Sequence, residues 1–282
     1  MSTAINALIA AERLPDDYRT VVDRHWRPLA DQIADLWVDD MRPLLIGING
    51  AQGSGKTTLC RFLETLLIEH NLRTVTLSLD DLYLTRAERL DLAEHEHPLF
   101  ATRGVPGTHD VALGEAILDD LLAGRTAALP RFDKADDDRA SVRRMIEPPL
   151  DVVLFEGWCV GAVPQPAADL RQPLNALERY DDAEGVWRQE VNRRLATDYA
   201  ELFARTDLLV MLRIDGFESV RANRALQEQK LAASNPEGAA IMVDATLDRF
   251  LMHYERLTRW MLEEIPGRAG VVIPIGPDQQ PV

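Results

Sequence analysis

The sequence of 282 residues predicts an α/β fold, in which a five-stranded, mainly parallel sheet carries helices on both faces. Five short apolar segments are spaced along the chain, and segments with helical periodicity lie between them. The composition agrees, since 46% hydrophobic and 27% charged residues are typical of a globular protein with a full core. Because no segment approaches about 18 consecutive apolar residues, we expect no membrane span.

The first expected element is a helical extension that occupies residues 1–40. Apolar residues recur on helical faces from Ile5 to Trp37, and we expect Pro15 and Pro28 to divide this segment into separate helices. The segment does not begin with basic residues followed by an apolar run, as a secretory signal does. We therefore expect a cytoplasmic protein.

The remaining residues, 41–282, are expected to form one domain in which strands and helices alternate. Each predicted strand is a short apolar run, as in a parallel sheet buried on both faces; the runs are residues 44–48, 74–79, 152–155, 208–212 and 270–275. Helical spacing appears in residues 57–70, 111–123, 187–205, 217–232 and 244–264. Three irregular stretches are predicted to be loops, and long loops in α/β domains often carry function; they are residues 85–108, 131–147 and 161–174.

A phosphate-binding loop is expected between the first strand and the helix that follows it. The pattern G-x-x-x-x-G-K-[ST] is matched by Gly50, Ala51, Gln52, Gly53, Ser54, Gly55, Lys56 and Thr57. The glycines let successive backbone N–H groups point into one cavity, and the helix N-terminus adds a positive dipole. We expect these residues and Thr58 to bind a nucleotide, with Lys56 on its β- and γ-phosphates and the Thr57 hydroxyl on Mg²⁺.

Carboxylates follow two further strands, at the edge where open α/β sheets bind their ligands. Glu156 ends the third strand, and Asp80 and Asp81 follow the second. We expect Glu156 to hold Mg²⁺ directly or through water, while the two aspartates fit a general base and a metal or substrate contact. Because neighbouring side chains of a strand point to opposite sides, only one of the two aspartates is expected to meet a reacting proton.

The residues around these acids form a recognisable set. Ser78, Asp80 and Tyr83 follow the second strand as Ser-x-Asp-x-x-Tyr, and Glu156 precedes Gly157. This pattern resembles the P-loop kinases related to uridine kinase, pantothenate kinase and phosphoribulokinase. Longer segments, from about residue 40 to the C-terminus, resemble the D-glycerate 3-kinase family of plants, fungi and bacteria; they are residues 78–85, 103–110, 130–134, 155–158, 174–175, 250 and 254–258.

The resemblance implies a P-loop NTPase fold of the kinase type and ATP-dependent phosphorylation of D-glycerate to 3-phosphoglycerate, with ATP and Mg²⁺ as cofactors. It assigns the general base to Asp80, and we expect Asp80 to join Thr57 and Glu156 around Mg²⁺. Two alternatives stay open: a kinase for another small alcohol, of the nucleoside or pantothenate type, and a nucleotide-dependent switch or assembly ATPase without an acceptor. The loops hold no dense aromatic cluster, which argues mildly against a nucleoside.

Candidate contacts for the small-molecule acceptor lie in the loops. Arg103 and His109 flank a glycine-containing turn, and a guanidinium binds a carboxylate such as that of glycerate through two parallel hydrogen bonds. The alternative for Arg103 is a solvated surface position. Asp81 and Tyr83, which follow the second strand, are further candidates.

The loop after residue 130 offers two more cations. Arg131 and Lys134 precede an acidic run, and we expect them either to neutralise phosphate or substrate or to pair with those acids. The family usually carries a longer, glycine-containing loop before an Asp-Arg pair, whereas this chain has the compact residues 135–139. The resemblance therefore does not predict the substrate contacts of this loop.

A lid is expected around residues 214–235, on the helix after the fourth strand. Arg221 and Arg224 lie three residues apart there. In kinases of this class such arginines close over the transferring phosphoryl group, and the alternative is a solvated helix face. Further along, Tyr254, Leu257 and Trp260 recur at helical spacing and are expected in the core.

The net charge limits the classes of binding partner, and the cysteine content indicates the redox state of the thiols. The formal net charge of −15 repels phosphate backbones at long range, so we expect neither nucleic acid nor an anionic membrane as a partner. An anionic small molecule needs a local positive pocket. Cys60 and Cys159 lie in apolar surroundings without a zinc-binding spacing and are expected to be reduced and buried. The oligomeric state stays open.

Overall fold

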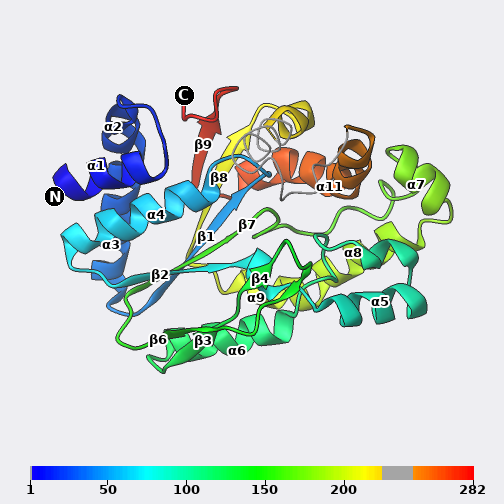
Figure 1. Ribbon diagram of the computed structural model, residues 1–282, viewed down its shortest axis with the longest axis horizontal. Coiled ribbons are helices and arrows are strands. Elements are labelled where there is room, and N and C mark those ends of the chain that lie inside the picture. The colour runs from blue at the N-terminus through cyan, green and yellow to red at the C-terminus, as the bar shows by residue number, and fades with distance from the viewer. Residues whose placement is uncertain (1, 224–243) are drawn as a thin grey trace.

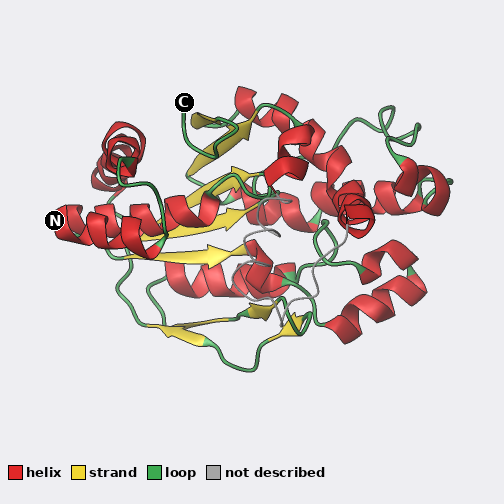
Figure 2. Ribbon diagram, turned by 45° about the horizontal axis from the view of Figure 1, so that its top comes forward, coloured by secondary structure: helices red, strands yellow, loops and turns green. Residues whose placement is uncertain are grey.

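The computed structural model describes residues 2–223 and 244–282, and a five-stranded parallel sheet forms its centre (Figure 1, Figure 2). The strands lie in the order β2-β7-β1-β8-β9, and every neighbouring pair is parallel. Their bounds are Leu44–Gly50 (β1), Thr74–Ser78 (β2), Val152–Gly157 (β7), Leu208–Ile214 (β8) and Val271–Ile275 (β9). The predicted α/β class and its five strands are confirmed.

The pairing register brings the carboxyl ends of three strands side by side. Asn49 of β1 pairs with Gly157 of β7, and Ser78 of β2 pairs with Glu156 of β7. Every residue of β1 and β7 is buried, which explains why these strands are continuous apolar runs without alternation. The loops that follow the three strands therefore meet at one edge of the sheet.

The N-terminal helices cover one face of the sheet together with α4 (Lys56–Leu67). They are α1 (Ser2–Ala11), α2 (Tyr18–Val21) and α3 (Arg27–Asp40), and their buried side chains share one core cluster with β1, β8 and β9. The predicted extension is thus helical, and its apolar residues pack mainly against α4, which itself lies on the sheet.

One expected break in this segment is wrong. Pro15 separates α1 from α2, but the chain stays helical through Pro28. A π-helical turn, Val22–Trp26, leads directly into α3, whose first turn contains the proline. The wider turn relieves the clash between the proline ring and the carbonyl of the preceding turn, so the helix continues.

The opposite face of the sheet is covered mainly by α6 (Val111–Leu122) and α9 (Asp198–Ala204), while α11 (Asp244–Glu264) contributes to the core on both faces. The predicted helix 187–205 consists of two helices, because the backbone at Thr197 leaves the helical conformation between α8 (Val186–Ala196) and α9. Of the predicted helix 217–232, residues 217–223 are helical and the rest lies outside the described residues. A further helix, α7, spans Ala176–Asp181.

Two of the three predicted loops contain regular structure. The stretch 85–108 holds α5 (Arg86–His95), which starts with a capping box: the Thr85 hydroxyl accepts from the Glu88 N–H, and the Glu88 carboxylate accepts from the Thr85 N–H. The stretch 131–147 contributes to two small antiparallel sheets: β3 (Ala127–Leu129) with β6 (Arg144–Ile146), and β4 (Phe132–Asp133) with β5 (Asp138–Arg139). Residues 161–174 form the expected loop. None of the helices in the described ranges is long and apolar enough to cross a membrane.

We predict that the N-terminal helices contribute directly to the stability of the domain. Trp26 is 2% exposed, belongs to the cluster under the sheet, and donates its indole N–H to the Tyr18 hydroxyl at 3.3 Å. Trp26→Ala should lower the free energy of unfolding by about 3–5 kcal/mol, as expected for loss of a buried aromatic side chain. Urea unfolding measures this.

The matched control is Val38→Ala on α3, because Val38 is 61% exposed. Its effect should stay within about 0.5 kcal/mol. Equal effects of the two substitutions would show that the N-terminal helices are not part of the cooperative core.

Candidate active site

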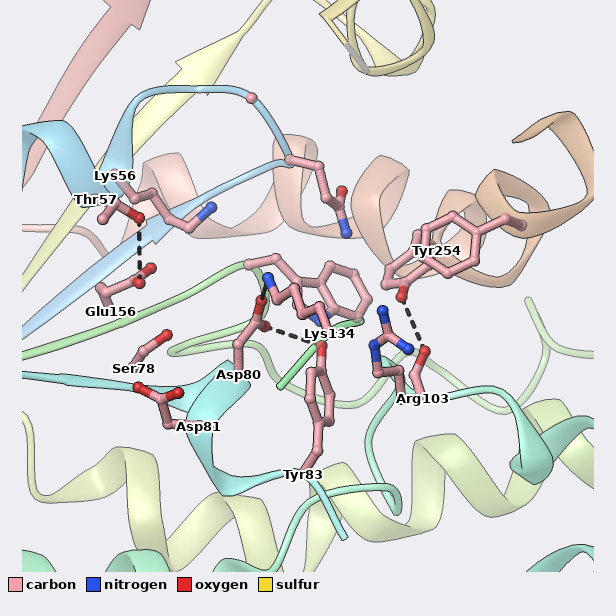
Figure 3. Close-up of a pocket in the computed structure, with 14 residues that line it drawn as sticks. Lys56, Thr57, Ser78, Asp80, Asp81, Tyr83, Arg103, Lys134, Glu156 and Tyr254 are labelled. Carbon is pink, nitrogen blue, oxygen red and sulfur yellow. Dashed lines mark hydrogen bonds and ion pairs between the residues drawn. The ribbon is translucent and has the colours of Figure 1, made fainter. Parts of the chain in front are cut away.

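A cavity of about 370 Å³ lies at the edge where β1, β2 and β7 end (Figure 3). Its wall combines the phosphate-binding loop, the residues after β2 and β7, the turn before α6, the β4–β5 hairpin and α11. The lining residues are Gln52, Gly53, Lys56, Thr57, Ser78, Asp80, Asp81, Tyr83, Arg103, Lys134, Glu156, Trp158, Phe250 and Tyr254. The structure thus gathers most of the predicted site residues around one space.

The predicted phosphate-binding loop has the backbone that its glycines permit. Gly53 and Gly55 have φ of 76° and 92°, in the left-handed region that disfavours other residues. A Cβ at Gly50 would lie 2.4 Å from Ser54 Oγ, so the close approach of the loop requires glycine there. Helix α4 begins at Lys56, whose ammonium donates to the Ala51 carbonyl at 3.2 Å. The helix N-terminus and Lys56 thus lie together as a phosphate-binding loop requires, and the binding of phosphate there stays a prediction.

Thr57 and Glu156 lie together beside this loop. The Thr57 hydroxyl is 3.4 Å from Glu156 Oε1, and Glu156 is almost fully buried. Burial raises the pKa of Glu156 even though the Lys56 ammonium lowers it, so the carboxylate lacks full charge compensation. Hydroxyl and carboxylate oxygens are ligands that Mg²⁺ prefers beside a nucleotide, and this pair fits that ion. Among the described residues, no group of three or more His, Cys, Asp and Glu lies close enough together to hold a metal ion.

The two adjacent aspartates occupy different environments. Asp80 accepts a hydrogen bond from Lys134 Nζ at 2.6 Å and another from the Tyr83 hydroxyl at 2.9 Å. Asp81 instead accepts from the backbone N–H of Phe132 at 3.0 Å, and Figure 3 shows the two carboxylates pointing apart. The expected separation is present, although β2 ends at Ser78 and a 3₁₀ turn, Leu79–Leu82, produces it instead of strand alternation.

These environments shift the two pKa values in opposite directions. Burial favours the neutral form of Asp80, but the charge and hydrogen bond of Lys134, the charge of Lys56 and the bond from Tyr83 outweigh it and lower the pKa of Asp80. Burial dominates at the neighbour and raises the pKa of Asp81. Of the two aspartates, Asp80 is therefore more fully ionised at neutral pH and is the one available to accept a proton.

Arg103 and Lys134 reach the cavity from different loops. Lys134 pairs with Asp80 and not with the acids of its own loop, so the second expected role does not describe its contact; the first, neutralising phosphate or substrate, stays a prediction. Arg103 pairs with Asp137, and its guanidinium lies over the Phe132 ring at 5.4 Å from the centroid. A solvated surface position for Arg103 is thereby excluded, because its side chain is 21% exposed and lines the cavity.

Three aromatic residues of the wall were not recognised as site residues from the sequence: Trp158, Phe250 and Tyr254. The Tyr254 hydroxyl donates to the Arg103 carbonyl at 2.9 Å, and the Trp158 indole donates to the Gly104 carbonyl at 2.8 Å. The rings of Trp158 and Tyr254 meet edge to face at 4.9 Å. Helical spacing placed Tyr254 in the core, and it is indeed buried, but only the structure shows that its buried hydroxyl fixes the Arg103 turn.

Two predicted acceptor contacts lie outside the cavity. His109 is stacked beneath Tyr83 with ring centroids 4.6 Å apart, and its Nδ1 lies 2.7 Å from the Tyr199 hydroxyl. Burial lowers the pKa of His109 to about 3, so a neutral ring supports Tyr83 from below instead of meeting an anionic acceptor. Arg131 is exposed and is not among the lining residues, because the β4 strand that follows it turns Phe132 inward.

The predicted lid is only partly described. Arg221 is exposed and pairs with Asp248 of α11 at 2.5 Å, away from the residues that line the cavity. Arg224 lies outside the described residues. The predicted catalytic role of both arginines stays a prediction. Both cysteines, in contrast, are free and buried as expected.

Comparison with known proteins agrees with this geometry, although no family model matches the chain. The kinase mug58 of Schizosaccharomyces pombe is 35% identical over 226 residues, which cover 76% of this chain and 79% of that protein. The chloroplastic D-glycerate 3-kinase of Arabidopsis thaliana is 32% identical over 228 residues, 77% of this chain and 47% of that protein. The chain thus spans about half the length of the Arabidopsis enzyme.

Solved structures give the same answer for the fold. The D-glycerate 3-kinase of Cryptococcus neoformans var. grubii superimposes with a TM-score of 0.71 at 26% identity, over 90% of this chain and 97% of that one. Together with the phosphate-binding loop, Glu156 and the Asp80 element around one cavity, these relatives establish the family. The chain belongs to the D-glycerate 3-kinase-like family of P-loop kinases, which are ATP-dependent phosphotransferases.

Proposed function

We propose that the protein transfers the γ-phosphoryl group of ATP to a hydroxyl of D-glycerate and forms 3-phosphoglycerate. The observation that carries the proposal is the grouping of three kinds of residue around one cavity: phosphate-loop Lys56, the ionised carboxylate of Asp80, and the guanidinium of Arg103 (Figure 3). They match the phosphoryl group, the hydroxyl and the carboxylate of the substrates. The Arabidopsis and Cryptococcus relatives, which carry this activity in their names, support the same acceptor.

The chemistry assigns each group one task. Asp80 takes the proton of the acceptor hydroxyl while the oxygen–phosphorus bond forms and the bond from phosphorus to the bridging oxygen of ADP breaks. Lys56 offsets negative charge on the transferring group. Thr57 and Glu156 would hold Mg²⁺, which supplies further charge neutralisation at the phosphates. The base role is the one proposed for Asp80, whose two oxygens accept from Lys134 and Tyr83; its predicted contact with Mg²⁺ stays a prediction.

The cavity favours a small anionic acceptor over a nucleoside. Its volume of about 370 Å³ must accommodate the reacting phosphate end of ATP as well as the acceptor. Four aromatic residues, Tyr83, Trp158, Phe250 and Tyr254, nevertheless line the wall, and two of them come from helix α11, outside the loops for which no dense aromatic cluster was expected. However, Trp158 and Tyr254 are 2% and 3% exposed and hydrogen-bond the turn at Arg103, so they build the wall and offer no open ring face for a base.

The first test is acceptor choice. With Mg-ATP, the purified protein should phosphorylate D-glycerate, with much lower turnover on glycerol, pantothenate and uridine. Glycerol and uridine have no carboxylate for Arg103, and the carboxylate of pantothenate lies at the far end of a long chain from its hydroxyls. Coupled measurement of ADP release and detection of 3-phosphoglycerate report the reaction. Hydrolysis of ATP without transfer to any acceptor would favour the switch or assembly ATPase, and preference for uridine would favour a nucleoside kinase.

We predict that Asp80 and Asp81 separate in function. Asp80→Asn keeps the shape of the side chain but removes the proton acceptor, so turnover should fall by about 10²–10⁴-fold, the usual size of general-base catalysis. Asp81→Asn, the matched neighbour, should reduce turnover far less. ATP binding, measured by calorimetry, should persist in both variants. If Asp81→Asn loses transfer while Asp80→Asn keeps near-normal transfer, the general base is Asp81 and not Asp80.

We also predict a pH effect from the ion pair between Lys134 and Asp80. The lowered pKa of Asp80 keeps the base ionised, and transfer is lost only as the pH falls through that value. Lys134→Met removes the largest of the effects that lower the pKa of Asp80, so this pKa should rise and the acidic limb of the kcat/KM profile should move to higher pH. The control is Arg143→Met, which removes a charge from an exposed position nine residues further along the chain and should leave the pH dependence unchanged. If the acidic limb of the kcat/KM profile stays at the same pH in Lys134→Met, Asp80 is not the base whose titration controls the reaction.

A further inference from the structure

An acid with no role so far lies in the β4–β5 hairpin next to the cavity. Asp137 has a φ of 54°, in the left-handed region that few non-glycine residues adopt and that Asp and Asn tolerate better than most. The conformation turns the compact loop before β5 sharply. It places the Asp137 carboxylate between two guanidinium groups, those of Arg89 and Arg103.

Arg89 anchors this acid from below. The Arg89 side chain on α5 is 2% exposed, and its Nη2 lies 2.9 Å from Asp137 Oδ2 and donates to the Asp137 carbonyl at 2.7 Å. Arg89 also donates to the carbonyls of Leu84 and Ala101. A charge this deeply buried needs its partner, because removing the partner leaves the guanidinium uncompensated. Asp137 is therefore fixed in place and is not a mobile occupant of the cavity.

The other carboxylate oxygen of Asp137 engages Arg103 at a single atom, Nη1. Among the residues that the structure describes, Nε and Nη2 of Arg103 have no hydrogen-bond partner. These two nitrogens form one edge of the planar guanidinium, and such an edge binds a carboxylate through two parallel hydrogen bonds. The Phe132 ring, 5.4 Å away, supports the face of the same group.

We propose that Asp137 is a positioning residue, which holds Arg103 by one corner so that its opposite edge receives the carboxylate of the acceptor. The proposal rests on the function proposed above, in which that acceptor is a hydroxy acid. A chain of contacts runs from buried Arg89 through Asp137 to Arg103, and the compact loop acts on the acceptor through this arginine. Asp137 thus contributes to the choice of an acidic acceptor without touching it.

The test is the kinetics of Asp137→Asn with D-glycerate. Asparagine tolerates the left-handed backbone, and the change removes the charge that orients Arg103. The KM for D-glycerate should rise about tenfold, the size expected for loss of a charge-assisted hydrogen bond, while kcat and the KM for ATP stay within about twofold. The control is Asp136→Asn, which removes the same charge from the neighbouring exposed residue and should leave all three constants unchanged. If Asp137→Asn unfolds because buried Arg89 loses its partner, the double variant Arg89→Met with Asp137→Asn, which removes both charges of the pair, takes its place.

A double-mutant cycle separates positioning from a merely structural effect. In an Arg103→Ala background, adding Asp137→Asn should not raise the KM for D-glycerate further, because the arginine through which it acts is gone. Additive effects would overturn the proposal, as would an unchanged KM or a lower KM in the single variant, which would mean that Asp137 competes with the acceptor. If wild-type protein transfers phosphate to no hydroxy acid, the proposed function fails and this inference fails with it. If wild type does transfer phosphate but the effects add, only the role of Asp137 fails.

Discussion

Three neighbouring parallel strands, β2, β7 and β1, end at the same edge of the sheet, and every group of the proposed site is placed relative to that edge. The register pairs Ser78 with Glu156 and Asn49 with Gly157, so the phosphate-binding loop, Glu156 and the turn that carries Asp80 begin within a few residues of one another. Strands β1 and β7 are buried on both faces and cannot slip without exposing their apolar side chains. The core of the domain therefore sets the spacing of the catalytic groups.

Local charge compensation is the second principle of the site. The chain carries a formal charge of −15, yet Lys56, Arg103 and Lys134 all reach one cavity. Lys134 is paired with Asp80 and Arg103 with Asp137, whereas Lys56 bonds a carbonyl of its own loop. A ligand that brings phosphates and a carboxylate meets cations that are already positioned, so little reorganisation accompanies binding. The pairing with Lys134 also keeps Asp80 ionised in spite of its partial burial.

Much of this arrangement could be predicted from the sequence, because it depends on local patterns. Apolar runs identify the strands, and the glycine and lysine spacing identifies the loop at residues 50–57. Helix α5 could also be predicted from the sequence, since the spacing of Thr85 and Glu88 is that of a capping box. The helix was missed because it has almost no apolar stripe: Arg89 is its one buried residue.

The rest depends on contacts between residues far apart in the chain. The pairing of Lys134 with Asp80 spans 54 positions, and that of Asp137 with Arg103 spans 34, so spacing alone could not distinguish them from bonds within the acidic loop. His109 looked like an acceptor contact because it flanks the same turn as Arg103. The fold turns it under Tyr83, where burial keeps it neutral. Tyr254 is correctly predicted as buried, but its hydrogen bond to Arg103 crosses 151 positions.

The central claim is that one cavity holds the acceptor between Asp80 and Arg103, next to the phosphate-binding loop. A crystal structure with Mg²⁺, a non-hydrolysable ATP analogue and D-glycerate tests it most directly. The account predicts an acceptor hydroxyl within hydrogen-bond distance of Asp80 and the acceptor carboxylate on Nε and Nη2 of Arg103. D-glycerate bound outside this cavity, or inside it with its carboxylate away from Arg103, would contradict the account.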